Sequence, residues 1–461
     1  LIGILVLIAV AAGITWYATG REPGPRIVVT APQAVIGHES KLSVAIDTPA
    51  GKLTSLDVLL EQGGNIVPIF TLKSGGAAEL THVGPGRLVL DRPIGKQQAP
   101  DLVEGKAEIV VTASRPVLFG YQQAVSKVIR DVEVSLTPPI ISVVSTGHYI
   151  AQGGAEMVIY RVSPAKVASG VQVGTDDYPG YPASGAHVVT KDPGLRVAFF
   201  ALLWNQGPST PISLYARDDA GNVGHATFDY QVFPKDFRKS NIGISDAFLQ
   251  KVVPPILANN PDFKVPDPSN LVDAFVRINR DLRREDTAEI AALARETSPS
   301  MLWQGPWEQQ RDSAVEANFA DQRTYVYHGR VIDHEVHLGY DLASIAGAPV
   351  TAENSGRVLH AGWLDIYGNC VIIDHGMGVQ SLYGHMSSVE VRVGQMVTKG
   401  EEIGREGSTG LAGGAHVHFS MLVNGHFVTP IDWWSAKWIH DRILRKLEAA
   451  GAPASAFGPG A

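Results

Sequence analysis

The chain is poor in cysteine and has no excess of positive charge. Cys370 is the single cysteine among 461 residues, so no internal disulfide can form, and the apolar run around it predicts a buried core residue. The net charge of −8 lacks the basic footprint of nucleic-acid-binding proteins, which excludes nucleic acid as a partner. A hydrophobic content of 45% indicates a folded protein, and the length predicts about three domains.

Long apolar runs are also scarce, and the clearest one lies at the start of the chain. Residues 1–18 are almost wholly apolar, near the lower limit of about 17–25 residues that span a bilayer. Trp16 and Tyr17 follow where interfacial aromatic residues would anchor the outer end. We therefore expect a single-pass signal anchor over residues 1–20 in the cytoplasmic membrane, with the rest in the periplasm or cell-wall space. The competing interpretation is a signal peptide cleaved near Ala9-Val10-Ala11.

Residues 26–230 carry the alternating pattern of β-structure between Gly, Pro and Asp clusters. Pro138-Pro139 divides this region into two lengths suited to β-sandwiches, which predicts one module over 24–137 and another over 138–233. The second ends in a segment, 212–223, that resembles the closing hairpin of bacterial Ig-like modules. Neither module shows a cluster of chemically reactive residues, so we expect them to act as spacers or to dock other envelope proteins.

The pattern becomes helical between residues 234 and 310. Ser245-Asp246 begins an apolar-periodic stretch that is expected to stop at Pro254-Pro255, a second helix begins near Ser269, and 286–294 indicates a third. We expect this segment to be a rigid connector. The alternative is a lid over an active site, which would hold an enzyme silent.

A group of histidines and one aspartate follows at metal-site spacing. His416 and His418 lie two apart in a segment with strand composition, so both imidazoles should face the same side. His337 and Asp341 are four apart and would also share a face in an extended segment. Two histidines and a carboxylate leave one tetrahedral position of Zn²⁺ open for water, as in catalytic zinc sites.

The string His334-Glu335-Val336-His337 is not the helical HExxH zinc motif. The second histidine comes one residue too early, and Gly339 with the neighbouring β-branched residues favours a strand. The glutamate base of that motif is therefore absent. His385 and His416 remain the candidates to accept a proton from metal-activated water.

Residues from about Phe319 to Trp434 resemble the M23, or lysostaphin-type (LytM), metallopeptidases. The paired motifs H-x-x-x-D and H-x-H are accompanied in order by landmarks such as Tyr383-Gly384-His385 and Gly407-Ser408-Thr409-Gly410. The resemblance implies an antiparallel β-sheet peptidase domain over 311–437, followed by a C-terminal helix and tail over 438–461. It further implies one Zn²⁺ per chain with three ligands and two catalytic histidines: His337, Asp341 and His418 for the metal, and His385 and His416 for catalysis.

The sequence departs from the family pattern at two places. Ala415 stands where a proline usually precedes H-x-H, and Ser420 stands where an acidic residue usually follows the next Phe. Neither position supplies the metal chemistry, so these departures bear on substrate detail.

The expected molecule is mainly β and cuts peptide cross-links of bacterial peptidoglycan as a zinc endopeptidase. Two alternatives stay open. One is a non-catalytic LytM-type regulator that activates a cell-wall amidase, although such relatives have lost zinc ligands that are intact here. The other is a peptidase acting on another exported protein. The bond that is cut cannot be read from spacing.

Overall fold

The computed structural model describes residues 2–49, 52–72 and 80–457. Leu1 of the predicted anchor, residues 50–51 and 73–79 of the first predicted module, and residues 458–461 of the predicted tail lie outside this range. The fold is mainly β, as predicted. The chain divides into two compact units, one of Leu1–Pro139 with Arg217–Gly224 and one of Ile140–Ala216 with His225–Ala461.

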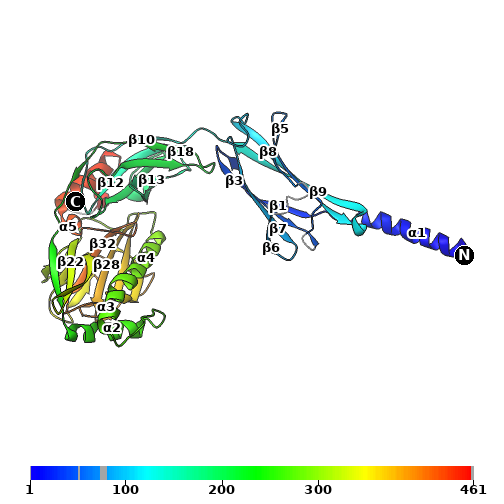
Figure 1. Ribbon diagram of the computed structural model, residues 1–461. Helices are drawn as coiled ribbons and strands as arrows, with labels where there is room; N and C mark the ends of the chain where they lie inside the picture. The colour runs from blue at the N-terminus through cyan, green and yellow to red at the C-terminus, as the bar shows by residue number, and fades with distance from the viewer. Residues whose placement is uncertain (1, 50–51, 73–79, 458–461) are drawn as a thin grey trace. The chain divides into compact units, whose positions relative to one another are not determined.

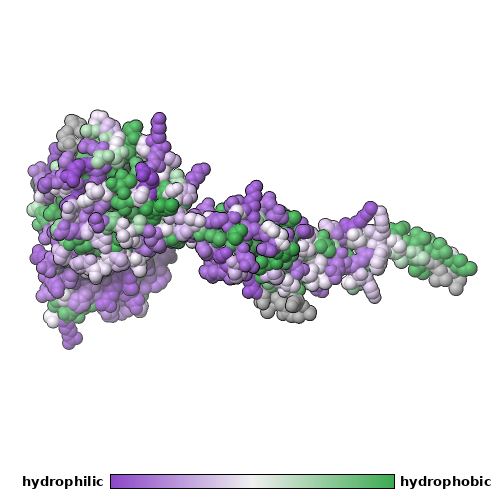
Figure 2. All heavy atoms as spheres, turned by 90° about the horizontal axis from the view of Figure 1, so that it is seen from above, coloured by the Kyte–Doolittle hydropathy of each residue, from purple (hydrophilic) through white to green (hydrophobic). Residues whose placement is uncertain are grey.

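The apolar start of the chain forms helix α1 (Ile2–Thr19). Figure 2 shows mostly apolar side chains along it. Among the described residues, no helix is both long and apolar enough to cross a membrane. The signal anchor expected over residues 1–20, which includes Leu1 outside the described range, stays a prediction.

The first unit is a sandwich of two sheets, with strand orders β1-β3-β7-β6 and β2-β9-β8-β4-β5. Alternate residues of facing strands enter one core, for example Val44 from β3 and Val58 from β4, both fully buried. The strands are β1 (Arg26–Ala31), β2 (Val35–Ile36), β3 (Ser40–Asp47), β4 (Ser55–Gln62), β5 (Asn65–Thr71), β6 (Thr81–Gly84), β7 (Arg87–Ile94), β8 (Gly105–Val117) and β9 (Gln122–Val134).

The second unit begins with further β-structure in two four-stranded sheets, β10-β12-β16-β15 and β14-β13-β17-β18, and a parallel pair, β11-β19. The core of these sheets continues into that of the residues that follow, so both belong to one folded body. The strands are β10 (Ile140–Val143), β11 (His148–Ala151), β12 (Gly154–Ser163), β13 (Ala168–Val173), β14 (Asp176–Pro179), β15 (Tyr181–Pro182), β16 (Leu195–Leu202), β17 (Ile212–Arg217), β18 (Val223–Ala226) and β19 (Tyr230–Phe233).

The largest sheet of the second unit has the order β21-β24-β32-β28-β27-β26-β30, with β33 beside β32, and each neighbouring pair is antiparallel, as predicted. Its middle is buried on both faces: Val371 enters one hydrophobic core and Cys370 the other, so the cysteine is a core residue as predicted. The strands are β21 (Ala314–Ala317), β24 (Tyr340–Ala343), β26 (Gly356–Leu364), β27 (Gly368–Gly376), β28 (Val379–Met386), β30 (Met396–Val397), β32 (Val417–Val423) and β33 (His426–Val428).

Two three-stranded sheets flank this one: β20-β22-β23 and β25-β31-β29. The strand β23 includes the His334–His337 string, which confirms that it is not a helical zinc motif. The strands are β20 (Lys239–Ile244), β22 (Asp321–Tyr327), β23 (Arg330–His337), β25 (Pro349–Thr351), β29 (Ser388–Val389) and β31 (Glu402–Arg405).

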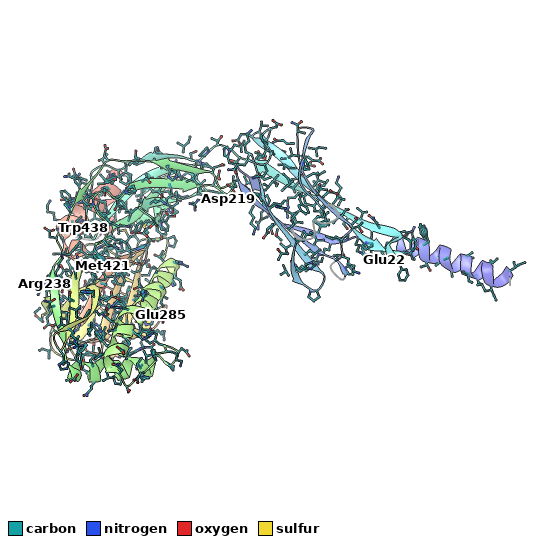
Figure 3. The ribbon with its side chains drawn as sticks, viewed as in Figure 1. Glu22, Asp219, Arg238, Glu285, Met421 and Trp438 are labelled. Carbon is teal, nitrogen blue, oxygen red and sulfur yellow. The ribbon has the colours of Figure 1, made fainter. Side chains whose placement is uncertain are left out.

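Three helices pack on one face of the large sheet: α2 (Asp246–Asn259), α3 (Leu271–Arg277) and α4 (Arg283–Leu293). Figure 1 shows them beside β28, and Figure 3 shows Glu285 on the outside of α4 and Met421 inside the unit. Ser245 caps α2 by accepting a hydrogen bond from the Phe248 amide. The prediction that α2 stops at Pro254-Pro255 is wrong, because the helix continues to Asn259. Its buried apolar face offsets the roughly 3 kcal/mol that an interior proline costs.

The chain ends in short helices, α5 (Ile431–Trp434), α6 (Ala436–Ile439) and α7 (Arg445–Ala449). They pack against the β-structure that opens the second unit. Lys446 of α7 forms a buried ion pair with Glu156 of β12 at 2.8 Å, and Trp433 of α5 lies against Phe199 of β16.

Candidate metal centre and active site

Three of the predicted residues bring their ligand atoms to one point. Nε2 of His337 lies 2.9 Å from Oδ1 of Asp341 and 3.0 Å from Nδ1 of His418. The His418 nitrogen lies 3.1 Å from the same carboxylate oxygen. All three residues are buried, with 5–8% of their surface exposed. Two imidazole nitrogens and one carboxylate oxygen facing each other form a set suited to a single zinc ion.

The chain brings these residues together by a different route from the one predicted. His337 is the last residue of β23 and Asp341 lies in β24, which belong to different sheets, so the two do not share the face of one strand. The turn between them contains Gly339, where a Cβ atom would lie 2.5 Å from Nε2 of His418. A residue without a side chain is needed there for the turn to pass this histidine. His418 pairs with Asp341 across β32 and β24, which fixes the third ligand.

Hydrogen bonds on the outer side of the ligand histidines fit metal binding. Nδ1 of His337 lies 3.0 Å from the carbonyl oxygen of Asn318, and Nε2 of His418 lies 3.0 Å from Oγ of Ser420. The Ser420 hydroxyl donates to the carbonyl oxygen of Leu338 at 2.8 Å, so it accepts from His418. Each outer nitrogen therefore carries the proton, and each inner nitrogen has a lone pair for the metal. Ser420, one of the two departures from the family pattern, supplies one of these bonds.

His385 and His416 lie beside the three ligands. Their ring centroids are 4.9 Å apart, and Nε2 of His416 lies 3.5 Å from Oδ1 of Asp341. His385 lies within a β-bulge of β28 and has a positive φ of 65°, a strained conformation that redirects its side chain. Nδ1 of His385 contacts the carbonyl oxygen of Thr409 at 2.8 Å, and Nδ1 of His416 contacts that of Gly414 at 3.1 Å. The Nε2 atom of each ring is left to face the site.

Burial and mutual charge shift the pKa values in this cluster. Burial alone would raise the pKa of Asp341, but His337, followed by His416 and His418, holds it well below its usual range. Burial lowers the pKa of His418 to about 4 and that of His385 well below its usual range. Burial also opposes protonation of His416, but the hydrogen bond with Asp341 raises its pKa. The carboxylate is therefore ionised, and His385 and His418 are neutral near pH 7.

An arginine that the sequence reasoning missed contacts the carboxylate ligand. Nη2 of Arg323, in β22, donates to Oδ2 of Asp341 at 3.2 Å, and its Nε lies 3.6 Å from Oδ2 of Asp321. The spacing of the family motifs did not predict Arg323, because this residue precedes the first motif and reaches the site from a neighbouring sheet.

The five residues line a cavity of about 310 Å³ that the helical segment helps to close. Phe248 of α2 and Phe275 of α3 stack edge to face in its wall, 6.0 Å between ring centroids. The segment expected to be a connector therefore contributes to the surface around the site. The other lining residues come from β20, β22, the start of α4, the helical turn 365–367 and the segment leading to β32: Ile242, Gly243, Ile244, Arg283, Arg323, Tyr325, Ile366, Tyr367, Leu411 and Gly413.

Comparison with known proteins gives matches to part of the chain. A DD-carboxypeptidase/endopeptidase, Mpg, of Neisseria meningitidis is 41% identical over 96 residues, which are 21% of this chain and 22% of that protein. The peptidoglycan DD-endopeptidase ShyA of Vibrio cholerae is 34% identical over 111 residues, 24% of this chain and 25% of that protein. The murein hydrolase activator EnvC of Escherichia coli is 38% identical over 95 residues, 21% of this chain and 23% of that protein.

The matched part is thus about a quarter of the length of each of these relatives. The model of peptidase family M23 matches residues 335–430, a range that contains all five predicted site residues. Residues 335–430 therefore form a domain of peptidase family M23.

Proposed function

We propose that this chain is a zinc-dependent endopeptidase that hydrolyses peptide cross-links of bacterial peptidoglycan. The observation that carries the proposal is the convergence of His337 Nε2, Asp341 Oδ1 and His418 Nδ1 within a buried site. The relatives named DD-endopeptidase support the substrate class. Peptidoglycan lies outside the cytoplasm, so the proposed place of action is the periplasm or cell-wall space.

The donor set fits one Zn²⁺ ion, held by His337, Asp341 and His418. When bound there, zinc would supply Lewis acidity, polarising the scissile carbonyl and lowering the pKa of water towards about 7. Two histidines of the chain would supply the proton transfer and the hydrogen bond that the reaction also needs. Because Nδ1 of His385 and of His416 is bonded to a backbone carbonyl, Nε2 of each ring is available to the substrate. One ring would accept a proton, and the other would donate a hydrogen bond to the carbonyl oxygen as charge develops on it.

The cavity wall would strengthen the electrostatic interactions at the proposed site. It excludes bulk water from the ligands, and electrostatic interactions are stronger in such surroundings than in water. Catalytic hydrogen bonds placed there need little rearrangement during the reaction.

The test is digestion of purified peptidoglycan by the full chain, with products identified by mass. We expect new muropeptides from the zinc-loaded protein, none after chelation, and recovery when zinc is returned. His418→Ala should lower the rate by at least about 100-fold, because a metal ligand should matter more than the outer partners that cost about 10–100-fold. His440→Ala, an exposed histidine on the C-terminal helical segment, is the matched control and should leave the rate unchanged.

A second candidate is a regulator that activates a cell-wall amidase. The match to the activator EnvC favours it. A chain that binds zinc, leaves every muropeptide intact and stimulates an amidase would replace the endopeptidase proposal with this one. A zinc-bound chain that does neither would direct the search to another exported protein as substrate.

A further inference from the structure

The two oxygens of Asp341 have different surroundings. Oδ1 contacts Nε2 of His337, Nδ1 of His418 and, at 3.5 Å, Nε2 of His416. Oδ2 accepts a hydrogen bond from Nη2 of Arg323 at 3.2 Å. The carboxylate therefore presents one oxygen to the ligand cluster, while a cation contacts the other.

Arg323 is itself held in place. Its side chain is only 20% exposed, and its guanidinium lies beside Asp321, whose side chain is 5% exposed. Oδ2 of Asp321 also accepts a hydrogen bond from the Ser240 hydroxyl at 2.7 Å. Ser240 belongs to β20, which pairs in parallel with β22. A continuous set of polar contacts thus runs from β20 through Asp321 and Arg323 to Asp341.

We propose that Arg323 is a positioning residue that holds Asp341 as a one-oxygen ligand and thereby keeps the zinc site four-coordinate and open. This inference rests on the proposed metal site. A planar guanidinium suits the task, because it can donate to Asp341 through one nitrogen while another faces Asp321. Without it, Oδ2 is free to turn towards the metal and to occupy the position that the substrate needs.

A second arginine provides a control for the loss of one positive charge. Arg330 begins β23 on the same hairpin as Arg323, but it is exposed and does not line the cavity. Arg330→Gln removes the same charge from the same hairpin without touching Asp341. Arg323→Lys keeps the charge but has a single nitrogen, so it tests whether the fork shape is required.

The experiment measures zinc affinity of the full chain by competition with a coloured chelator, and the visible absorption of Co²⁺ bound in place of zinc. We expect Arg323→Gln to weaken zinc binding by about 10–100-fold, the usual effect of removing a partner of a ligand. The cobalt absorption should lose intensity as the coordination number rises. Arg323→Lys should recover part of both signals, Arg330→Gln should match the wild type, and Ser240→Ala should give a smaller change in the direction of Arg323→Gln.

Folding is monitored in the metal-free state by thermal unfolding, so that a misfolded variant is recognised. A folded Arg323→Gln protein with wild-type zinc affinity and an unchanged cobalt spectrum would overturn the positioning role while leaving the proposed function intact. A wild-type chain that binds no zinc would instead overturn the proposed metal site, and this inference with it.

Discussion

At the scale of single residues, the site depends on which nitrogen of each histidine faces inward. Four histidines have one ring nitrogen bonded to a backbone carbonyl or a serine hydroxyl, with contacts of 2.8–3.1 Å. These bonds select the tautomer before a metal or substrate arrives, which reduces the rearrangement needed on binding.

Ser420→Ala should weaken zinc binding by about 10–100-fold, because His418 loses the acceptor that holds its outer N–H. Ser145→Ala is a matched control, since Ser145 makes a similar contact with His148, at 2.9 Å, in the β-structure that opens the second unit. Competition with a chelator measures both variants. Equal affinity of Ser420→Ala and wild type would show that the hydroxyl does not orient His418.

A buried carboxyl group on α4 gives a pH dependence to stability. Burial, then the neighbouring Asp365, raises the pKa of Asp286 to about 9, and Oδ2 of Asp286 accepts a hydrogen bond from the Ile366 amide. Between about pH 4 and pH 9 the folded chain keeps a proton that the unfolded chain releases. The free energy of unfolding should therefore fall as pH rises, by up to about 1.4 kcal/mol per pH unit.

Asp286→Asn cannot ionise and should lack this contribution. The variant should gain stability relative to the wild type as pH rises from 5 to 9, as measured by thermal unfolding across that range. Parallel curves for the two proteins would mean that Asp286 is ionised in the folded chain at these pH values.

At the scale of elements, the segment that carries α2 and α3 is built into the peptidase domain. Leu249, Val252 and Phe275 share a hydrophobic core with Tyr367 and Leu382 of the domain. A fragment that starts at residue 311 would expose this core, so the activity test uses the full chain. The same packing places Phe248 at the cavity wall.

Phe248→Ala should increase cleavage of cross-linked peptidoglycan several-fold, with a smaller gain on a short free peptide, because it widens the cavity on the side of α2. Phe263→Ala is the matched control: this ring packs on the same core but does not line the cavity. Rates on the two substrates provide the measurement. An equal or lower rate for Phe248→Ala on the polymer would show that this ring does not restrict access.

At the scale of the whole molecule, the first β-structure of the second unit and the C-terminal helices support the peptidase sheet from one side. Lys446 and Glu156 are 5% and 0% exposed in their side chains, so their ion pair is far from water. Trp303 and Trp307 each contact Trp433 edge to face, and all three belong to the hydrophobic core that this β-structure shares with the sheet.

Lys446→Met should lower the free energy of unfolding by about 3–5 kcal/mol, because it leaves the Glu156 carboxylate buried without its partner. Lys437→Met, which breaks the exposed pair with Asp441, should change it far less, because solvent screens an exposed ion pair. Denaturant unfolding measures both. Adding Glu156→Gln to Lys446→Met should restore part of the loss, and a loss no larger than that of Lys437→Met would contradict the structural role of the buried pair.

The sequence by itself determined the mainly β fold, the peptidase family and the five residues that meet at the site. It could do so because strand periodicity and motif spacing are local properties. The H-x-H pair is also local: His416 directly precedes β32, and His418 is the second residue of that strand. Only the tertiary structure decided how His337 and Asp341 meet, since a turn between two sheets brings them together. It also decided that Arg323 contacts Asp341, that α2 continues through two prolines, and that this helix lines the cavity. Each of these depends on burial or contact between segments far apart in the chain, and local sequence patterns do not predict such contacts.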